Sequence, residues 1–291
     1  MSDEPVRGAA GRRRPALSPS RASDFKQCPL LYRFRAIDRL PEPRSTAQLR
    51  GTLVHAALED LYGLPSHERV PDTAMRLVEP AWDRVAAADP ELASLADRDV
   101  LLREAKALLT GYYRLEDPTR FDPQCCEQLI EVELADGTLL RGYVDRIDVA
   151  PTGEVRVVDY KTGKAPAAAR ELAEFKALFQ MKFYAVALLR SRAVMPARLR
   201  LLYLADGQVL DYSPEHDELL RFERTLVAIW KAIQAAGASG NFRPNPSRLC
   251  SWCAHQALCP AFGGTPPPYP GWPEQIDDGD PDAVLQEIGA A

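Results

Sequence analysis

The hydrophobic residues of this chain recur with two periods, one typical of helices and the other of strands. In the helical stretches apolar residues recur every three or four positions, as at Leu53, Ala57 and Leu61. This pattern predicts helices over residues 20–34, 46–62, 72–88, 97–115, 170–191 and 213–236. Ser20 and Ser213 are expected to cap the first and the last of these helices, because a serine hydroxyl accepts hydrogen bonds from free N-terminal amides.

Short stretches rich in valine, isoleucine and tyrosine separate the later helices and read as strands. The predicted strands cover residues 128–134, 139–149, 154–161, 197–204 and 208–212. Helices come first, then strands, a helix, a hairpin and a last helix. This order predicts an α+β fold in which helices flank a small, mixed, mostly antiparallel sheet.

Composition divides the chain into a central domain and two flanking segments. Residues 1–16 are rich in glycine, arginine, alanine and proline, and are expected to be disordered. Residues 17–262 are expected to form the folded domain. Residues 263–291 begin with a Pro/Gly-rich run, for which we predict a tail without regular structure.

Length and charge restrict the classes of protein to consider. The 291 residues are 46% hydrophobic, which is enough for one large packed domain. No apolar run is long enough to cross a membrane, and the N-terminus lacks the apolar segment of a secretory signal. We therefore expect a cytoplasmic protein without a membrane partner. A net charge of -5 is not typical of a nucleic-acid binder, although a basic groove can exist on an acidic protein.

The end of the strand over 154–161 carries the first candidate chemistry. Asp159 and Lys161 are two residues apart, so both side chains lie on one face of the strand. A carboxylate can hold a hard divalent cation, and a lysine beside it can bind a phosphate or polarise a water. Phosphodiester cleavage requires this pairing. The alternative is an ordinary hairpin on which an exposed Asp and Lys have no role.

The hairpin loop before that strand predicts a second carboxylate at the same place. Pro151, Thr152 and Gly153 fit a three-residue loop whose last position has a left-handed backbone and favours glycine. Counting outward from this loop places Asp145 directly opposite Asp159. Opposed side chains lie about 5 Å apart at Cβ, so two carboxylates would repel unless a cation lay between them.

Three further residues lie on predicted helices. His55 is surrounded by apolar neighbours and is expected to face inward, where it could either complete the core or bind the same metal. Gln180 and Tyr184 are four residues apart, so they share a face and could position a phosphate or a base. Polar residues on a helix are common, and these two carry no argument alone.

The cysteines divide into a cluster and a pair. Cys250, Cys253 and Cys259 form a C-x2-C-x5-C motif, and Cys28 lies far upstream. The adjacent Cys125 and Cys126 are expected to be buried apolar residues. Four thiolates can hold zinc or a 4Fe–4S cluster, but zinc sites usually consist of two close pairs, which this layout lacks. His255 lies within the cluster loop as an alternative ligand.

Taken in order, these motifs resemble those of a known family. The motifs are SPSRASDFKQCPLLYRFR, GTLVHAALE, GYVDRIDV, VVDYKTGK, QMKFYA and the three-cysteine cluster. Their order resembles that of RecB-type exonucleases of the PD-(D/E)XK superfamily, over residues 18–262. The resemblance is greatest to the iron–sulfur branch, which includes the CRISPR-associated exonucleases and the AddB nuclease domain. It implies a restriction-endonuclease-like core and a C-terminal iron–sulfur loop that closes onto the N-terminal helix.

The resemblance also implies roles for individual residues. It implies that His55, Asp145 and Asp159 bind Mg²⁺ or Mn²⁺ and that Lys161 is the catalytic lysine. Gln180 and Tyr184 match the motif that follows. Either of two glutamates on the preceding strand could assist, namely Glu131 and Glu133. A 4Fe–4S cluster is implied for the cysteines, namely Cys28, Cys250, Cys253 and Cys259, with zinc as the alternative.

The expected activity is that of a metal-dependent DNA exonuclease. Its partner would be DNA, single-stranded or with free ends, and a helicase or repair protein is a further candidate. Four arginines near the active-site helices are expected to contact the phosphates, with Tyr184 stacking on a base: Arg21, Arg33, Arg35 and Arg50. Two alternatives remain: a non-catalytic DNA-binding or scaffold subunit, and a zinc-stapled protein without nuclease activity.

Overall fold

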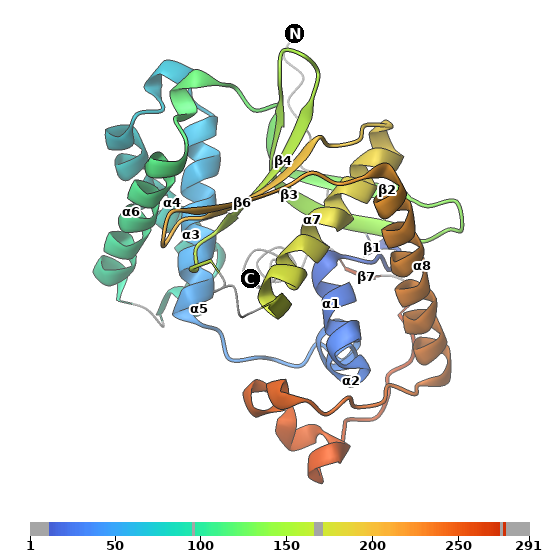
Figure 1. The fold of residues 1–291 in the computed structure, drawn as a ribbon. Coiled ribbons are helices and arrows are strands. Elements are labelled where there is room, and N and C mark those ends of the chain that lie inside the picture. The colour runs from blue at the N-terminus through green and yellow to red at the C-terminus, as the bar shows by residue number, and fades with distance from the viewer. Residues whose placement is uncertain (1–11, 95–96, 166–170, 274–275, 278–291) are drawn as a thin grey trace.

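A computed structural model shows one sheet with a layer of helices on each of its two faces (Figure 1). It describes residues 12–94, 97–165, 171–273 and 276–277. Within these ranges no helix has both the length and the apolar character needed to cross a membrane.

The central sheet has five strands in the order β2-β3-β4-β5-β6. Their bounds are β2 Cys125–Glu133, β3 Leu139–Val149, β4 Val155–Lys161, β5 Arg198–Tyr203 and β6 Gln208–Tyr212. Only β4 and β5 are parallel, because helix α7 (Glu171–Arg192) connects them across the sheet; the other neighbours are antiparallel. The prediction of a mixed, mostly antiparallel sheet in an α+β fold is confirmed.

The helices agree with the apolar pattern except at the N-terminal end. Their bounds are α1 Pro19–Gln27, α2 Pro29–Tyr32, α3 Thr46–Tyr62, α4 Pro71–Ala88, α5 Pro90–Ser94, α6 Arg98–Leu115 and α8 His216–Ser239. The single helix predicted over 20–34 is interrupted, since Cys28 has an extended backbone with φ -162° and ψ 114°. Pro29 explains the break, because a proline disfavours the helical conformation of the residue before it.

Both predicted helix caps are wrong. Ser18, not Ser20, accepts the capping hydrogen bond of α1, from the backbone amide of Arg21 at 3.3 Å. Helix α8 is capped by Glu215, which forms a capping box with Glu218; the predicted cap, Ser213, lies two residues earlier. A serine followed by proline does begin a helix in this chain, but the pair is Ser18 and Pro19 at the start of α1.

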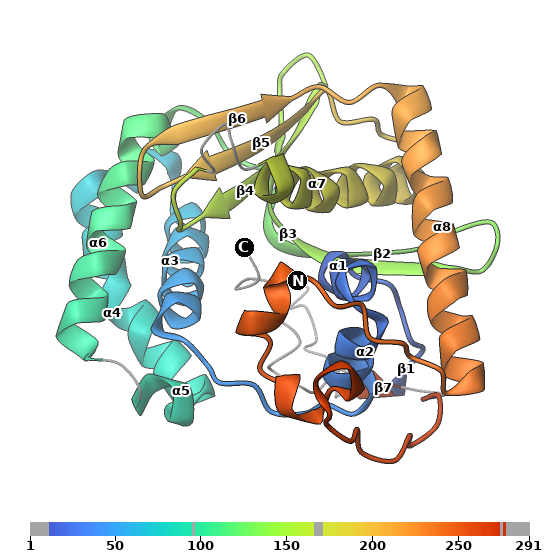
Figure 2. The ribbon, with the colours of Figure 1, turned by 60° about the horizontal axis from the view of Figure 1, so that its bottom comes forward.

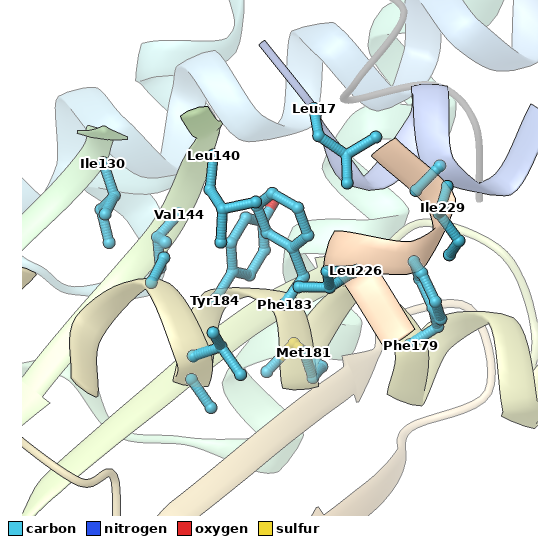
Figure 3. Packing of buried hydrophobic residues seen from close by; sticks show 14 of the residues in the cluster. Leu17, Ile130, Leu140, Val144, Phe179, Met181, Phe183, Tyr184, Leu226 and Ile229 are labelled. Carbon is cyan, nitrogen blue, oxygen red and sulfur yellow. The ribbon is translucent and has the colours of Figure 1, made fainter. Parts of the chain in front are cut away.

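Successive side chains along a strand point to opposite faces of the sheet, so they pack alternately against the two helical layers. Val158 and Tyr160 of β4 join one core cluster with α3, α4 and α6. Val157 joins the other, with α1, α7 and α8. Figure 3 shows this second core, in which Phe183 and Tyr184 of α7 lie near Leu140 of β3, and Phe179 lies beside α8. Gly142 permits this approach, because a Cβ there would lie 3.0 Å from Cε1 of Tyr184.

The hairpin between β3 and β4 has the predicted register. Arg146 pairs with Val158, and the amide of Ala150 donates to the carbonyl of Glu154 at 2.9 Å. Gly153 has φ +90°, the left-handed backbone that the loop requires. Continuing the register by one position places Asp145 opposite the residue after Val158, which is Asp159.

Segments from both ends of the chain pack against the domain. Leu17 is buried and donates its amide to the carbonyl of Leu139 at 2.8 Å, and strand β1 (Arg12–Arg13) pairs with β7 (Ile276–Asp277). Within the Pro/Gly-rich segment, Tyr269 donates its hydroxyl to the carbonyl of Gly237 in α8 at 2.8 Å. The composition did not predict these contacts. The disorder expected for residues 1–11 falls outside the described residues.

Candidate functional site

Three carboxylates lie in one row across β2, β3 and β4. Gln128 of β2 pairs with Val144 of β3, so Glu127 falls opposite Asp145. The β3–β4 register puts Asp159 opposite Asp145 on the other side. The side chains of Asp145 and Asp159 are both buried, with 6% and 2% of their surface exposed. Two adjacent buried carboxylates are costly without a counter-charge, so the row favours a bound cation.

His55 reaches this row from helix α3. Its Nδ1 lies 3.3 Å from Oε1 of Glu127 and 3.6 Å from Oδ2 of Asp145. Its Nε2 lies 3.1 Å from the carbonyl oxygen of Tyr160. One donor atom from each of His55, Glu127 and Asp145 lies within 4.8 Å of the other two. One imidazole and two carboxylates are a donor set that suits a divalent cation.

Asp159 contacts a chain of polar groups that leads to α7. Its Oδ2 lies 2.8 Å from Nζ of Lys161, which donates to Oε1 of Gln180 at 3.0 Å. Nε2 of Gln180 then donates to the hydroxyl of Tyr184 at 3.0 Å. Although it is close to Lys161, Oδ2 of Asp159 is buried and accepts no hydrogen bond of acceptable geometry among the described residues. The contact with Lys161 is therefore an ion pair, and it places the ammonium beside the carboxylate row.

Burial and mutual repulsion perturb the protonation of the site. Desolvation, followed by the charge of Asp159, raises the pKa of Asp145 well above its ordinary value. Burial opposes the charge of His55, but the neighbouring carboxylates, Asp145 first, raise its pKa to about 9. Protons and a cation therefore compete for these groups.

This protonation predicts that stabilisation by metal depends on pH. The folded-state pKa values of Asp145 and His55 are both raised, so their contribution to stability is lost as pH rises, for His55 between about 6.5 and about 9. Mn²⁺ should therefore increase Tm more at about pH 9 than at about pH 6. Scanning calorimetry with and without the metal measures the difference. A shift that is equal at both pH values would contradict protons and metal competing for these groups.

The structure brings all six predicted catalytic residues into one pocket. The pocket is lined by His55, Tyr143, Asp145, Asp159, Tyr160, Lys161, Gln180 and Tyr184. Beside them the structure adds Glu127, which we did not predict. The two glutamates considered instead lie elsewhere: Glu131 forms an ion pair with Arg141 at 2.6 Å, and Glu133 with Arg14 at 2.6 Å.

The expected contacts with DNA are wrong for two residues. Tyr184 is only 1% exposed and belongs to the core, so it cannot stack on a base. Arg33 is buried in an ion pair with Asp38 at 3.0 Å. The other three arginines are partly exposed, so their contact with DNA stays a prediction. Each has a partner within the chain: Asp24 and Glu42 for Arg35, Glu104 for Arg50 and the carbonyl of Ala16 for Arg21.

The four clustered cysteines line a second pocket, where the segment after α8 returns beside α2 (Figure 2). Its lining includes the cysteines of the motif and the upstream one: Cys28, Cys250, Cys253 and Cys259. The amide of Asn245 donates to Sγ of Cys28 at 3.3 Å, and the amide of Ser247 donates to Sγ of Cys250 at 3.2 Å. Backbone donors of this kind stabilise thiolate ligands.

The other candidate ligands lie beside or outside the cysteine pocket; His255 is among the residues that line it. His255 is buried, with Nε2 2.8 Å from Oε1 of Glu42, so that nitrogen faces a carboxylate. Cys125 and Cys126 are half-buried in β2 and absent from the cysteine pocket, and were expected to be fully buried. Burial raises the pKa of both thiols, that of Cys126 to about 12, so they favour the neutral form.

Comparison with known proteins agrees with this geometry. The family model for the PD-(D/E)XK nuclease superfamily matches residues 16–260. The chain is 24% identical over 278 residues to the Gene 69 protein of Mycobacterium phage D29, covering 85% of this chain and 97% of that protein. The fold is similar to that of a Eubacterium rectale protein provisionally named an exonuclease. That similarity has a TM-score of 0.56 and 13% identity, over 82% of this chain and 87% of the other. The family model covers most of the chain, so the chain belongs to the PD-(D/E)XK nuclease superfamily.

Proposed function

We propose that this chain is a Mg²⁺- or Mn²⁺-dependent deoxyribonuclease that digests DNA from a free end. The observation that carries the proposal is the buried pair of carboxylates, Asp145 and Asp159, beside Lys161. We further propose that it acts on single-stranded ends in the cytoplasm, in DNA repair or recombination, with a helicase or repair protein as partner. Family membership supports a nuclease, and the provisional name of the Eubacterium rectale protein is consistent with digestion from an end.

The donor set fits the proposed cation. His55, Asp145 and Asp159 would hold it, as the resemblance implies, with Glu127 as a fourth donor. Asp159 offers a buried carboxylate whose Oδ2 pairs with the ammonium of Lys161, so a cation and this lysine would share one carboxylate. When bound, such a cation supplies Lewis acidity toward a phosphate oxygen and a water.

Lys161 is proposed to act on the phosphate. Its ammonium is buried between Asp159 and Gln180, which fixes its position. Positive charge held beside the scissile phosphate stabilises the charge that develops during cleavage. Tyr184 contributes indirectly, because it holds Gln180 and lies in the core.

Replacing Lys161 by alanine should lower turnover by about 10²-fold or more while leaving DNA affinity nearly unchanged. The reason is that its contact strengthens in the transition state. Single-turnover cleavage at saturating protein, combined with a binding titration in Ca²⁺, separates the two effects. Weaker binding with unchanged turnover would assign Lys161 to substrate affinity instead.

The function as a whole is tested with linear and circular single-stranded DNA of the same sequence. With Mg²⁺ or Mn²⁺, the wild-type protein should degrade the linear form to short products and leave the circle intact. Chelation by EDTA should stop the digestion. Cleavage of the circle would establish an endonuclease, and no cleavage of either form would refute the proposed activity.

We propose that the four clustered cysteines hold a 4Fe–4S centre. The four thiols lie together, with three of them in a C-x2-C-x5-C motif and Cys28 far upstream, and this layout lacks the two close pairs usual for zinc.

A further inference from the structure

One residue that lines the active-site pocket has no part in the chemistry described above. Tyr143 of β3 lies in this pocket together with the proposed metal ligands. Each of the other residues of the lining forms a hydrogen bond or an ion pair with a neighbour. Among the described residues, Tyr143 has no such partner, either for its hydroxyl or for its ring. Its side chain can therefore contact a bound substrate without breaking an internal interaction.

The neighbours of Tyr143 on β3 show which way its side chain points. Val144 belongs to the core that contains the residues of α7, and a Cβ on Gly142 would lie 3.0 Å from Cε1 of Tyr184. Successive side chains of a strand point to opposite faces, so Tyr143 points away from this core. It is half-buried and belongs to neither core cluster. The fold therefore does not require its ring for packing.

The ring of Tyr143 lies beside an apolar side chain of β2 and close to the carboxylate row. Leu129 pairs with Tyr143 in the β2–β3 register, so their Cβ atoms are about 5 Å apart. Leu129 is also half-buried and outside both core clusters. Two residues further along these strands lie Glu127 and Asp145, at about 7 Å. A nucleotide whose phosphate meets the carboxylates would thus have its base near this apolar pair.

We propose that Tyr143 is a substrate-contacting residue, whose ring stacks on an unpaired base next to the scissile phosphate. This inference rests on the proposed function, because it assigns a substrate contact to the same site. An aromatic ring can stack on any base, so the contact adds affinity without sequence preference. A base inside a duplex is already stacked and paired, so the contact also favours single-stranded DNA. The competing explanation is that the hydroxyl of Tyr143 binds a phosphate and the ring is only a spacer.

Two substitutions of Tyr143 distinguish these explanations. Tyr143→Phe keeps the ring and removes the hydroxyl, whereas Tyr143→Leu removes the ring and keeps an apolar side chain. The control is Tyr113→Leu, which changes a half-buried tyrosine of α6 outside the pocket, whose hydroxyl donates to the carbonyl of Arg69 at 2.9 Å. Tm of each variant shows that it is folded.

The measurement is the Kd for a single-stranded oligonucleotide in Ca²⁺, by fluorescence anisotropy. Tyr143→Leu should raise the Kd by about 10-fold, and Tyr143→Phe and Tyr113→Leu by less than about 2-fold. No effect of Tyr143→Leu would overturn the inference. Equal losses for the leucine and phenylalanine variants of Tyr143 would overturn it too, because they would assign the contact to the hydroxyl.

An abasic site moved along the same oligonucleotide identifies the stacked base. At one position it should raise the Kd of the wild-type protein by about 10-fold. At that position Tyr143→Leu should lose nothing further, because ring and base belong to one contact. Additive losses at every position would refute the inference while leaving the proposed function intact. If the wild-type protein neither binds nor cleaves single-stranded DNA, the proposed function itself is wrong.

A second measurement needs only the wild-type protein. Single-stranded DNA that carries 5-iodouracil at each position in turn is irradiated in the complex, and mass spectrometry identifies the cross-linked peptide. We expect a cross-link to Tyr143. Cross-links only to other residues, such as the exposed Trp252, or none at any position would overturn the inference.

Discussion

Replacing Asp159 by asparagine should reduce DNA cleavage by about 10³-fold or more without unfolding the protein. The amide has nearly the same shape as the carboxylate but lacks the charge that attracts a cation. Asp145 and Asp159 are both buried and repel each other. Removing one charge relieves this repulsion, but it also removes the counter-charge of the buried Lys161, so Tm of the metal-free variant should change little.

The control for this variant is a carboxylate on the same sheet but outside the row. Glu131→Gln changes a residue of β2 that pairs with Arg141 and does not line the pocket. It should cleave at the wild-type rate, whereas Glu127→Gln should cleave more slowly. Initial rates at several Mg²⁺ concentrations compare the three variants. Near wild-type cleavage by Asp159→Asn would show that the active site lies elsewhere.

Replacing Cys250 by serine should remove the metal centre and strongly lower stability. The centre would join residue 28 to residue 250, so it restricts nearly the whole unfolded chain. By analogy with a disulfide of that loop length, losing the whole link would cost about 5 kcal/mol. The loss should also loosen the segment after α8, which packs beside the helix that precedes α3.

Iron content, colour and Tm of anaerobically purified protein provide the measurement. Wild-type protein should be brown and contain about four irons per chain, since four cysteines suit a 4Fe–4S cluster. Cys250→Ser should be colourless and less stable. Cys125→Ser should match the wild type, because this thiol lies on β2 outside the cysteine pocket. One zinc per colourless wild-type chain would contradict the iron–sulfur assignment.

The strands and their pairing could be predicted because the signals are local. β-branched runs define the strands, and Gly153 fixes one hairpin loop. The same loop geometry recurs between β2 and β3, where Gly137 has φ +86° and the amide of Leu134 donates to Thr138. Counting back from that loop pairs Glu127 with Asp145, so Glu127 could have been found from the sequence.

Other features depend on partners that are distant in the sequence. Arg33 is charged and does not fall on the apolar positions of a helix. It is nevertheless buried, because its guanidinium pairs with Asp38 and donates to the carbonyl of Pro267. Tyr184 is polar at its tip, but the core of α7 and β3 encloses its ring. A sequence reading assigns such groups to the surface, because only the folded chain shows which of them have internal partners.

The cation among the carboxylates is the feature on which the proposed activity depends most. Anomalous diffraction from crystals of the wild-type protein soaked in Mn²⁺ locates it directly. We expect an anomalous peak within bonding distance of His55, Asp145 and Asp159, and none in crystals of Asp159→Asn. A peak only at other residues, or no peak at Mn²⁺ concentrations that support DNA cleavage, would contradict a metal centre at this row.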